Sequence, residues 1–246
     1  MKYMLLICVD KNIKLSPAEG EAMGSTTERW VAQTGKVRLT GGPLRPADTA
    51  TTVRVRDGQL LVSDGPFAET KEQIAGYDLL ECDSMDDAVA VAARHPVTVI
   101  GSVEVREVPG AWLADRLAQG EPAAPGTIRY MLLHCLDESA ELDPDLDAGL
   151  PGSPAQVTQD AWDEDLEERG IKLSGVRLGP AAQARTVQVR DGQLLVIDGP
   201  FAETKEQVAG LNVLECTDLD QAIEIAAGHP TAQFGTFELR PFEDFE

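Results

Sequence analysis

The chain has 246 residues, 43% of them hydrophobic and 26% charged, a composition typical of a soluble globular protein with more than one small domain. Its 42 acidic and 21 basic residues give a net charge of −21, and a phosphate backbone would be repelled, so we expect no nucleic-acid partner. No apolar run reaches membrane-spanning length and residues 1–10 lack the features of a cleaved signal, so we expect a cytoplasmic protein with no membrane partner.

The chain contains an internal repeat. Residues 56–73 return as residues 190–207 with one difference, Ser63 against Ile197, and the offset is 134 residues (190 − 56 = 134). A repeat of this length is a domain rather than a solenoid unit. We therefore predict a first domain over residues 1–108, a linker over 109–127 and a second domain over 128–246.

The first repeat predicts a regular order of elements. Ser16 followed by Pro17 and Glu19 is a helix-start signal, and Asp57-Gly58 between alternating segments indicates a tight hairpin turn. In chain order we predict a strand over 2–9, a helix from Pro17 to about Gln33, a strand over 36–44, a hairpin over 52–56 and 59–63, a strand over 74–82, a helix capped by Ser84, and a strand over 102–108.

The second repeat follows the same order. Ser153-Pro154 starts its first helix, which we expect to reach about Arg169 and to be followed by a strand over 171–178. Between the repeats we predict a short helix over Trp112–Gln119 and a flexible tether. Each repeat is thus βαββαβ with an inserted hairpin, which predicts an α+β fold made of two ferredoxin-like units.

Cysteine and histidine spacing indicates neither a metal site nor a cofactor. The four cysteines form no CxxC pair, the three histidines are dispersed, and no glycine-rich phosphate loop or serine-nucleophile motif occurs. We interpret the cysteines as buried free thiols on strands. The expected partner is a small-molecule ligand that needs no cofactor.

The DGPFAETKEQ segment, with a YMLL start and a VEVR or FELR end, resembles the YCII-related family, also called the DGPF-domain family, over nearly the full length of both repeats. The resemblance implies ferredoxin-like units that pair sheet to sheet in a dimeric α+β barrel. In a tandem chain the two repeats would pair with each other, and further homo-oligomerisation stays open. Some relatives are cofactor-free enzymes on small organic molecules, for which a histidine and an aspartate have been proposed as the acid–base pair.

The pattern of that acid–base pair is not reproduced here. The family's histidine lies on the first helix, where this chain has Trp30 and Trp162 but no histidine. The family's aspartate lies near the junction of the second helix and the last strand, where this chain has His95 and His229. The mechanism implied by the resemblance therefore does not transfer unchanged.

Topology predicts a cluster of ionisable groups in repeat 2. In a ferredoxin-like sheet the first strand lies antiparallel between the third and fourth strands, so its end meets their starts. His134, His229 and the loop after Ile197 should therefore converge. We expect His134 or His229 to act as general base or acid, Asp198 to orient it, and Lys205 to bind an anionic or enolate oxygen.

The remaining candidates for substrate binding are Glu203, Arg177 and Trp162, with Asp64 and His95 in repeat 1. Ile7 stands where repeat 2 has His134, so we predict that repeat 2 carries the more complete site.

Each of these residues also has a structural interpretation. DGPF can be a turn with a core-filling phenylalanine, and Thr-Lys-Glu-Gln fits a capping box. His95 and His229 can cap a helix, and His134 can be a satisfied core histidine. Trp162 can pack in the core, and Arg177 can be a surface or salt-bridged group.

Two functional hypotheses follow. The first is a cofactor-independent lyase, isomerase or cyclase that uses histidine and aspartate to transfer protons on a small, largely apolar carbonyl or phenolic compound. The alternative is a non-catalytic small-molecule-binding, accessory or scaffold protein.

Overall fold

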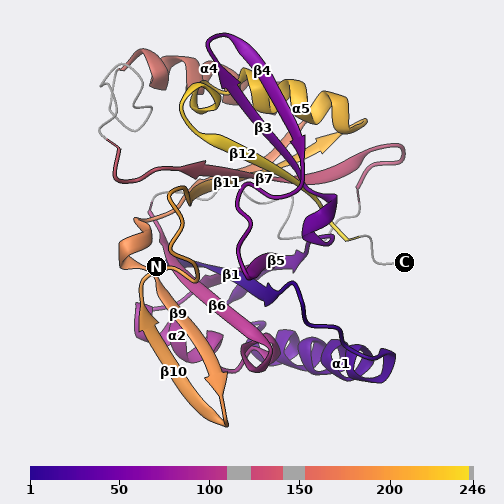
Figure 1. Cartoon of the computed structure of the whole chain (residues 1–246), viewed down its shortest axis with the longest axis vertical. Helices are drawn as coiled ribbons and strands as arrows, with labels where there is room; N and C mark the ends of the chain where they lie inside the picture. Colours follow the sequence, from indigo (N-terminus) through magenta and orange to yellow (C-terminus); the bar gives the residue numbers. More distant parts are fainter. Residues whose placement is uncertain (110–122, 141–152, 244–246) are drawn as a thin grey trace. The chain divides into compact units, whose positions relative to one another are not determined.

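The computed structural model describes residues 1–109, 123–140 and 153–243, and it has an α+β fold with two antiparallel six-stranded sheets (Figure 1). Repeat 1 contributes β1 (Lys2–Asp10), α1 (Pro17–Thr34), β2 (Arg38–Pro43), η1 (Ala47–Thr49), β3 (Thr51–Arg56), β4 (Gln59–Asp64), β5 (Glu72–Glu81), α2 (Met85–Ala92), η2 (Pro96–Val99) and β6 (Gly101–Val108). Repeat 2 contributes β7 (Ile128–Leu136), α4 (Pro154–Glu168), β8 (Lys172–Arg177), η4 (Ala181–Gln183), β9 (Arg185–Arg190), β10 (Gln193–Asp198), β11 (Gln207–Cys216), α5 (Leu219–Gly228), η5 (Pro230–Gln233) and β12 (Thr236–Pro241). The predicted order of elements is confirmed, while the short helix predicted over Trp112–Gln119 lies outside the described residues.

Both long helices begin where the sequence signals place them. Ser16 caps α1 in a capping box, because its hydroxyl accepts from the Glu19 backbone N–H and the Glu19 carboxylate accepts from the Ser16 backbone N–H at 2.8 Å. Ser153 caps α4 by accepting from the Gln156 backbone N–H at 3.0 Å. In each helix proline follows the cap, where its missing N–H costs no hydrogen bond.

Both hairpins turn through an Asp-Gly pair in the left-handed region. Asp57 and Gly58 have φ of 52° and 72°, and Asp191 and Gly192 have φ of 52° and 73°. Two successive residues with positive φ form the type I′ turn, whose twist matches that of antiparallel strands. The hairpins β3–β4 and β9–β10 are therefore specified by local sequence.

The core of each sheet has the strand order of a ferredoxin-like unit. β1 lies antiparallel between β5 and β6, and β7 lies antiparallel between β11 and β12. β2 adds to β5 at one edge of the first sheet, and β8 adds to β11 at one edge of the second. The predicted placement of the first strand between the third and fourth core strands is confirmed in both repeats.

The hairpins are exchanged between the repeats. β3 of repeat 1 pairs with β12 of repeat 2 through Val53 opposite Phe237, and β9 of repeat 2 pairs with β6 of repeat 1 through Val187 opposite Val103. The sheet orders are accordingly β10-β9-β6-β1-β5-β2 and β4-β3-β12-β7-β11-β8. In Figure 1 the colours show the exchange, since the orange hairpin joins purple strands and the indigo hairpin joins yellow ones.

The chain therefore divides into two compact units that do not coincide with the repeats. Unit 1 comprises Met1–Ala47, Glu69–Gly110 and Leu178–Glu203, and unit 2 comprises Asp48–Ala68, Ala111–Arg177 and Thr204–Glu246. Each unit consists of one repeat without its hairpin together with the hairpin of the other repeat.

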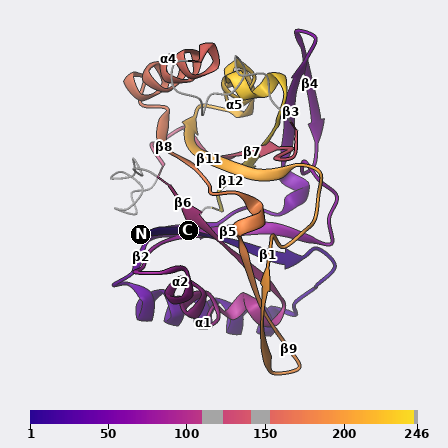
Figure 2. The ribbon, with the colours of Figure 1, turned by 90° about the vertical axis from the view of Figure 1, so that its left-hand side faces the viewer.

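In each unit two helices cover one face of the sheet (Figures 1 and 2). In unit 1 the core includes Leu5 of β1, Trp30 of α1 and Ala88 of α2. In unit 2 it includes Leu132 of β7 and Ile225 of α5. The exchanged strands complete these cores with Val187 in unit 1 and Val53 in unit 2, both of them fully buried.

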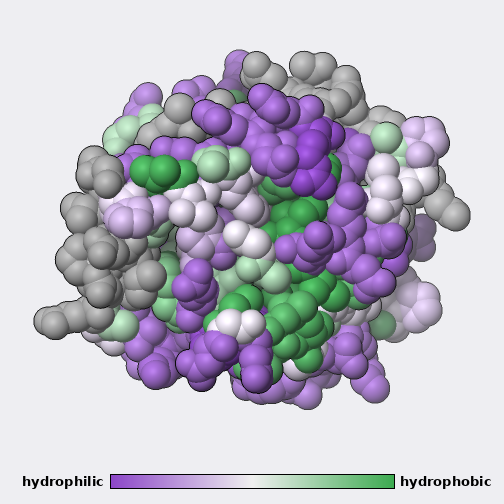
Figure 3. All heavy atoms as spheres, turned by 90° about the horizontal axis from the view of Figure 1, so that it is seen from above, coloured by the Kyte–Doolittle hydropathy of each residue, from purple (hydrophilic) through white to green (hydrophobic). Residues whose placement is uncertain are grey.

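The outer strands of the exchanged hairpins are apolar and exposed. Leu60, Leu61 and Val62 of β4 are each close to half exposed. The face seen from above the β3–β4 hairpin carries an apolar area bordered by hydrophilic residues (Figure 3). Among the described helices, none combines the length and apolar character needed to span a membrane.

Candidate functional site

A buried carboxyl group lies in the middle of the unit 1 sheet. Asp78 is on β5 and shares a face of that strand with Leu80, which belongs to the core beneath the helices. Gly41 of β2 lies opposite Asp78, and a Cβ at Gly41 would lie 2.1 Å from Asp78 Oδ1. The glycine therefore provides the space that the carboxyl group occupies.

Asp78 joins an arginine to a histidine. Its Oδ1 accepts from Arg38 Nε of β2 at 2.5 Å, and its Oδ2 lies 3.9 Å from His95 Nε2 at the start of η2. The His95 ring meets Trp30 of α1 edge to face at 4.6 Å between ring centroids. Sheet and helices thus bring a carboxyl group, a guanidinium and an imidazole together from four separate elements.

The backbone fixes the proton position on His95. Its Nδ1 accepts from the Val97 backbone N–H at 3.2 Å, which caps the first turn of η2. A neutral imidazole carries one proton, so that proton lies on Nε2, the nitrogen that faces Asp78. His95 therefore presents an N–H donor toward the carboxyl group.

Burial moves the proton affinities of both groups. It raises the pKa of Asp78 from 3.8 to about 6, although the Arg38 guanidinium acts in the opposite direction. It lowers the pKa of His95 from 6.5 to about 4, and the positive charge of Arg38 adds to that effect. Near neutral pH the pair is a carboxylate beside a neutral imidazole, and the carboxylate can be protonated at only mildly acidic pH.

Unit 2 holds a cluster of different chemistry at the matching positions. Asn212 of β11 replaces Asp78 and Lys172 of β8 replaces Arg38, at the same offset of 134 residues (212 − 78 = 172 − 38 = 134). His229 is retained, and its Nδ1 accepts from the Thr231 backbone N–H at 3.1 Å. Lys172 is paired with Asp163 at 2.8 Å and with Glu167 at 3.2 Å. This cluster contains no carboxyl group at the Asp78 position.

His134 adds a second imidazole to unit 2. Its ring lies edge to face with His229 at 4.7 Å and with Phe237 at 4.7 Å, and Trp162 meets His229 at 4.7 Å. Burial lowers the pKa of His134 to about 4, with a smaller contribution from the charge of Lys172 and an opposing one from its hydrogen bond with Asn212. Burial, followed by the neighbouring His134 and Lys172, lowers the pKa of His229 well below 6.5. Both rings are therefore neutral at physiological pH.

The structure brings together only part of the predicted cluster. His134, His229 and Trp162 meet in unit 2 as expected. Asp198, however, belongs to unit 1, where its carboxylate lies 3.5 Å from Arg185 Nε and is 91% exposed. The expected orientation of a histidine by Asp198 has no counterpart among these contacts, because the hairpin that carries Asp198 has joined the sheet of the other repeat.

The other loop candidates lie at the surface. Lys205 is 86% exposed and lies 3.9 Å from Asp137, while Glu203, Arg177 and Asp64 are exposed. His95, by contrast, is buried in the Asp78 cluster of unit 1. The expectation that repeat 2 holds the more complete site is also corrected, since the carboxyl–histidine contact occurs in repeat 1.

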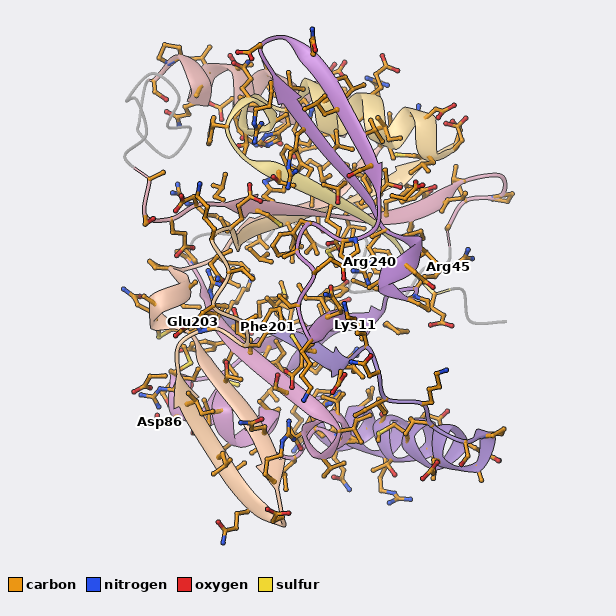
Figure 4. The ribbon with its side chains drawn as sticks, viewed as in Figure 1. Lys11, Arg45, Asp86, Phe201, Glu203 and Arg240 are labelled. Atoms are coloured by element: carbon orange, nitrogen blue, oxygen red, sulfur yellow. The ribbon has the colours of Figure 1, made fainter. Side chains whose placement is uncertain are left out.

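The DGPF motif attaches the exchanged hairpin to its host sheet. The Phe67 backbone N–H donates to Glu238 Oε2 of β12 at 2.9 Å, and the Phe201 backbone N–H donates to Glu104 Oε2 of β6 at 2.9 Å (Figure 4). Each glutamate is buried and also pairs with an arginine two residues along its strand, Arg240 or Arg106. The motif thus connects a turn from one repeat to a buried ion pair of the other.

The glycine of the motif is required by its backbone conformation. Gly65 and Gly199 have φ of 93° and 108°, a region that residues with a Cβ rarely adopt. The carbonyl of Gly65 accepts from the Thr52 hydroxyl at 2.7 Å, and that of Gly199 accepts from the Thr186 hydroxyl at 2.8 Å.

Asp78 and Arg38 were missed by sequence reasoning, although a signal was present. Asp78 interrupts the apolar strand predicted over residues 74–82, and a charged residue within such a strand requires a partner. The aligned position in repeat 2 is Asn212, a polar residue of nearly the same shape. A polar position retained at the same strand site in both repeats indicates a buried polar cluster.

Cysteines and metal-ligand types were also compared with expectation. Cys8, Cys82, Cys135 and Cys216 are free and buried, which confirms the interpretation as strand thiols. Within residues 1–109, 123–140 and 153–243, no three histidine, cysteine, aspartate or glutamate side chains are grouped to hold a metal ion.

Comparison with known proteins matches both repeats. The model of the YCII-related domain matches residues 1–110 and 130–246. The chain is also 37% identical over 98 residues to a protein of Rhizobium meliloti (strain 1021) that is described as uncharacterized protein R00369, and this match covers 33% of the chain and 79% of that protein. The two matched ranges correspond to the two repeats and cover most of the sequence. The chain therefore belongs to the YCII-related domain family and carries that domain twice.

Proposed function

We propose that the protein is a cofactor-independent enzyme that transfers protons on a small, largely apolar carbonyl or phenolic compound. Asp78 and His95 are its acid–base pair. The observation that carries this proposal is the contact between the two groups, 3.9 Å apart in a buried layer, with the pKa of Asp78 raised to about 6. A general base works best when its pKa lies close to the working pH.

The three side chains have different roles in this proposal. Asp78 takes a proton from a carbon or hydroxyl group of the substrate and returns it to another position. His95 donates from Nε2 to the substrate oxygen on which negative charge develops. Arg38 holds the carboxylate by its 2.5 Å hydrogen bond and partly neutralises it. At 17% exposure, the Arg38 side chain is the most solvent-accessible of the three, and it lies on the edge strand β2.

The test is exchange of substrate protons with solvent. Full-length protein is incubated in D2O with a panel of small 1,3-dicarbonyl compounds, 2-keto acids and phenols, and deuterium incorporation is followed by NMR. We expect accelerated exchange for at least one compound. Asp78→Asn should reduce this rate by about 10²- to 10⁴-fold, because it removes the base while keeping the shape of the side chain.

Repeat 2 supplies the matched controls. Asp78→Asn combined with Arg38→Lys recreates the Asn212 and Lys172 pair that repeat 2 already folds around, so loss of exchange in this double variant cannot be attributed to an unpaired arginine. Asn212→Asp should leave exchange unchanged. If no compound exchanges, or if Asp78→Asn keeps the wild-type rate, the pair is structural and the non-catalytic ligand-binding alternative takes its place.

A further inference from the structure

His229 carries a buried donor without a protein acceptor. Its side chain is 2% exposed, and its Nδ1 is occupied by the Thr231 N–H. The proton of the neutral ring is therefore on Nε2. Within the part of the chain that the structure describes, Nε2 has no hydrogen-bond partner. A buried N–H without an acceptor costs about 1–3 kcal/mol, so the position favours an acceptor oxygen.

His134 carries the complementary group, an acceptor. It is hydrogen-bonded to the Asn212 side chain, and Asn212 uses its Nδ2 to donate to the Ser174 carbonyl at 3.5 Å. The Asn212 carbonyl oxygen is thus the atom that receives the His134 proton. His134 Nε2 has no partner among the described residues, so the bonded nitrogen is Nδ1 and Nε2 presents a lone pair.

The two rings adjoin each other inside an aromatic environment. Their centroids are 4.7 Å apart, Phe237 lies 4.7 Å from His134, and Trp162 lies 4.7 Å from His229. The nearby positive charge of Lys172 is already paired with Asp163 and Glu167. The available chemistry is therefore one neutral donor and one neutral acceptor between aromatic rings.

We propose that unit 2 binds a small aromatic compound through a single hydroxyl group, which donates to His134 Nε2 and accepts from His229 Nε2–H. A hydroxyl group is both donor and acceptor, so it satisfies both nitrogens at once. A carbonyl oxygen would satisfy only His229, and a carboxylate would place lone pairs against the lone pair of His134. Unit 1 cannot form this site because Ile7 occupies the position of His134.

This site is independent of the acid–base pair proposed for unit 1. It uses residues of repeat 2 only, and it requires no turnover. Phenol without any other substrate is therefore a sufficient probe.

The experiment is nitrogen-detected NMR of the three imidazoles in the full-length protein at neutral pH. Without ligand, we expect the proton of His229 on Nε2 and the proton of His134 on Nδ1. Phenol should shift the Nε2 signals of both rings and leave His95 unchanged. Anisole has the same ring but no hydroxyl proton, so it should bind about tenfold more weakly or not at all.

A variant taken from the chain itself provides the control. His134→Ile places in repeat 2 the residue that repeat 1 has at Ile7, and it should abolish the phenol response of His229. The phenol–anisole contrast is measured on the unaltered chain and decides the proposal even if this variant fails to fold. Equal effects of phenol and anisole, no effect of phenol on either Nε2, or the opposite proton positions would each overturn the proposal.

Discussion

Asp78 and the three histidines respond to acid in opposite directions. The pKa of Asp78 is raised to about 6, so its contribution to stability is present below 3.8 and is lost as pH rises through 6. The pKa values of His95 and His134 are lowered to about 4, so their contributions are present above 6.5 and are lost as pH falls toward 4. In unit 1 the effects of Asp78 and His95 oppose each other, whereas in unit 2 no carboxyl group at position 212 offsets the two histidines.

Replacing His134 should therefore make the protein more resistant to acid. In the wild type, acidification from pH 7 to 4.5 protonates His134 in the unfolded chain but not in the buried native site. His134→Ile removes this difference, so the free energy of unfolding should fall by about 2 kcal/mol less over that interval. Urea unfolding at the two pH values measures the change. An equal loss in wild type and variant would show that His134 is not held neutral in the native state.

At the scale of elements, the exchanged hairpins are fixed by a small number of contacts. β3 pairs with β12 through three residue pairs, and β9 pairs with β6 through three. The buried ion pairs Glu238–Arg240 and Glu104–Arg106 add a hydrogen bond from the DGPF turn of each incoming hairpin. A buried ion pair contributes little when intact, yet it is costly to break, because the remaining charge is left without compensation.

Removing the Glu238 charge should loosen the β3–β4 hairpin. Glu238→Gln leaves the Arg240 charge without its carboxylate partner in a buried position, so we expect a loss of about 3–5 kcal/mol in the free energy of unfolding. Amide hydrogen exchange of β3 and β4 should accelerate more than that of β7.

Glu203→Gln is the matched control for this change. It makes the same substitution on the exposed segment after β10, where the expected effect is within about 0.5 kcal/mol. Uniform acceleration of exchange throughout the protein by Glu238→Gln would contradict a role specific to the hairpin.

At the scale of the whole molecule, the exchange makes each unit depend on both repeats. Val187 belongs to repeat 2 but is buried in the core of unit 1, and Val53 belongs to repeat 1 but is buried in the core of unit 2. A cavity at either valine therefore weakens the unit built mainly from the other repeat. The pairing of the two units into a barrel stays a prediction from the family resemblance.

Val187→Ala tests this dependence. The lost methyl groups and the resulting cavity should cost about 2 kcal/mol. Hydrogen exchange should accelerate in β1 and β6 of repeat 1 rather than in β7, although the substitution is in repeat 2. Val53→Ala should give the reciprocal pattern. Acceleration confined to the repeat that carries each substitution would show that the hairpins are not exchanged in solution.

Most of the secondary structure follows from local chemistry, and the sequence predicted it. The serine caps, the Asp-Gly turns and the apolar strands each act over a few residues, so their positions agree with the structure to within about two residues at most ends. The repeat offset likewise predicted two copies of one domain, and the family match confirms it.

The candidate site was predicted only in part. His134, His229 and Trp162 were expected together because they lie on elements whose order in the sheet follows from the βαββαβ pattern. Asp78 was missed because its two partners, Arg38 and His95, are separated from it by 40 and 17 residues and meet it only in the folded layer.

The sequence by itself determined the repeat, the helix and turn boundaries and the family, because these depend on residues close together along the chain. Only the tertiary structure decided which repeat receives each hairpin, and hence which unit holds Asp198. The hairpins are nearly identical in sequence, so local propensity cannot distinguish a sheet of their own repeat from that of the other. Buried contacts distant in sequence, such as Phe67 with Glu238, record the outcome.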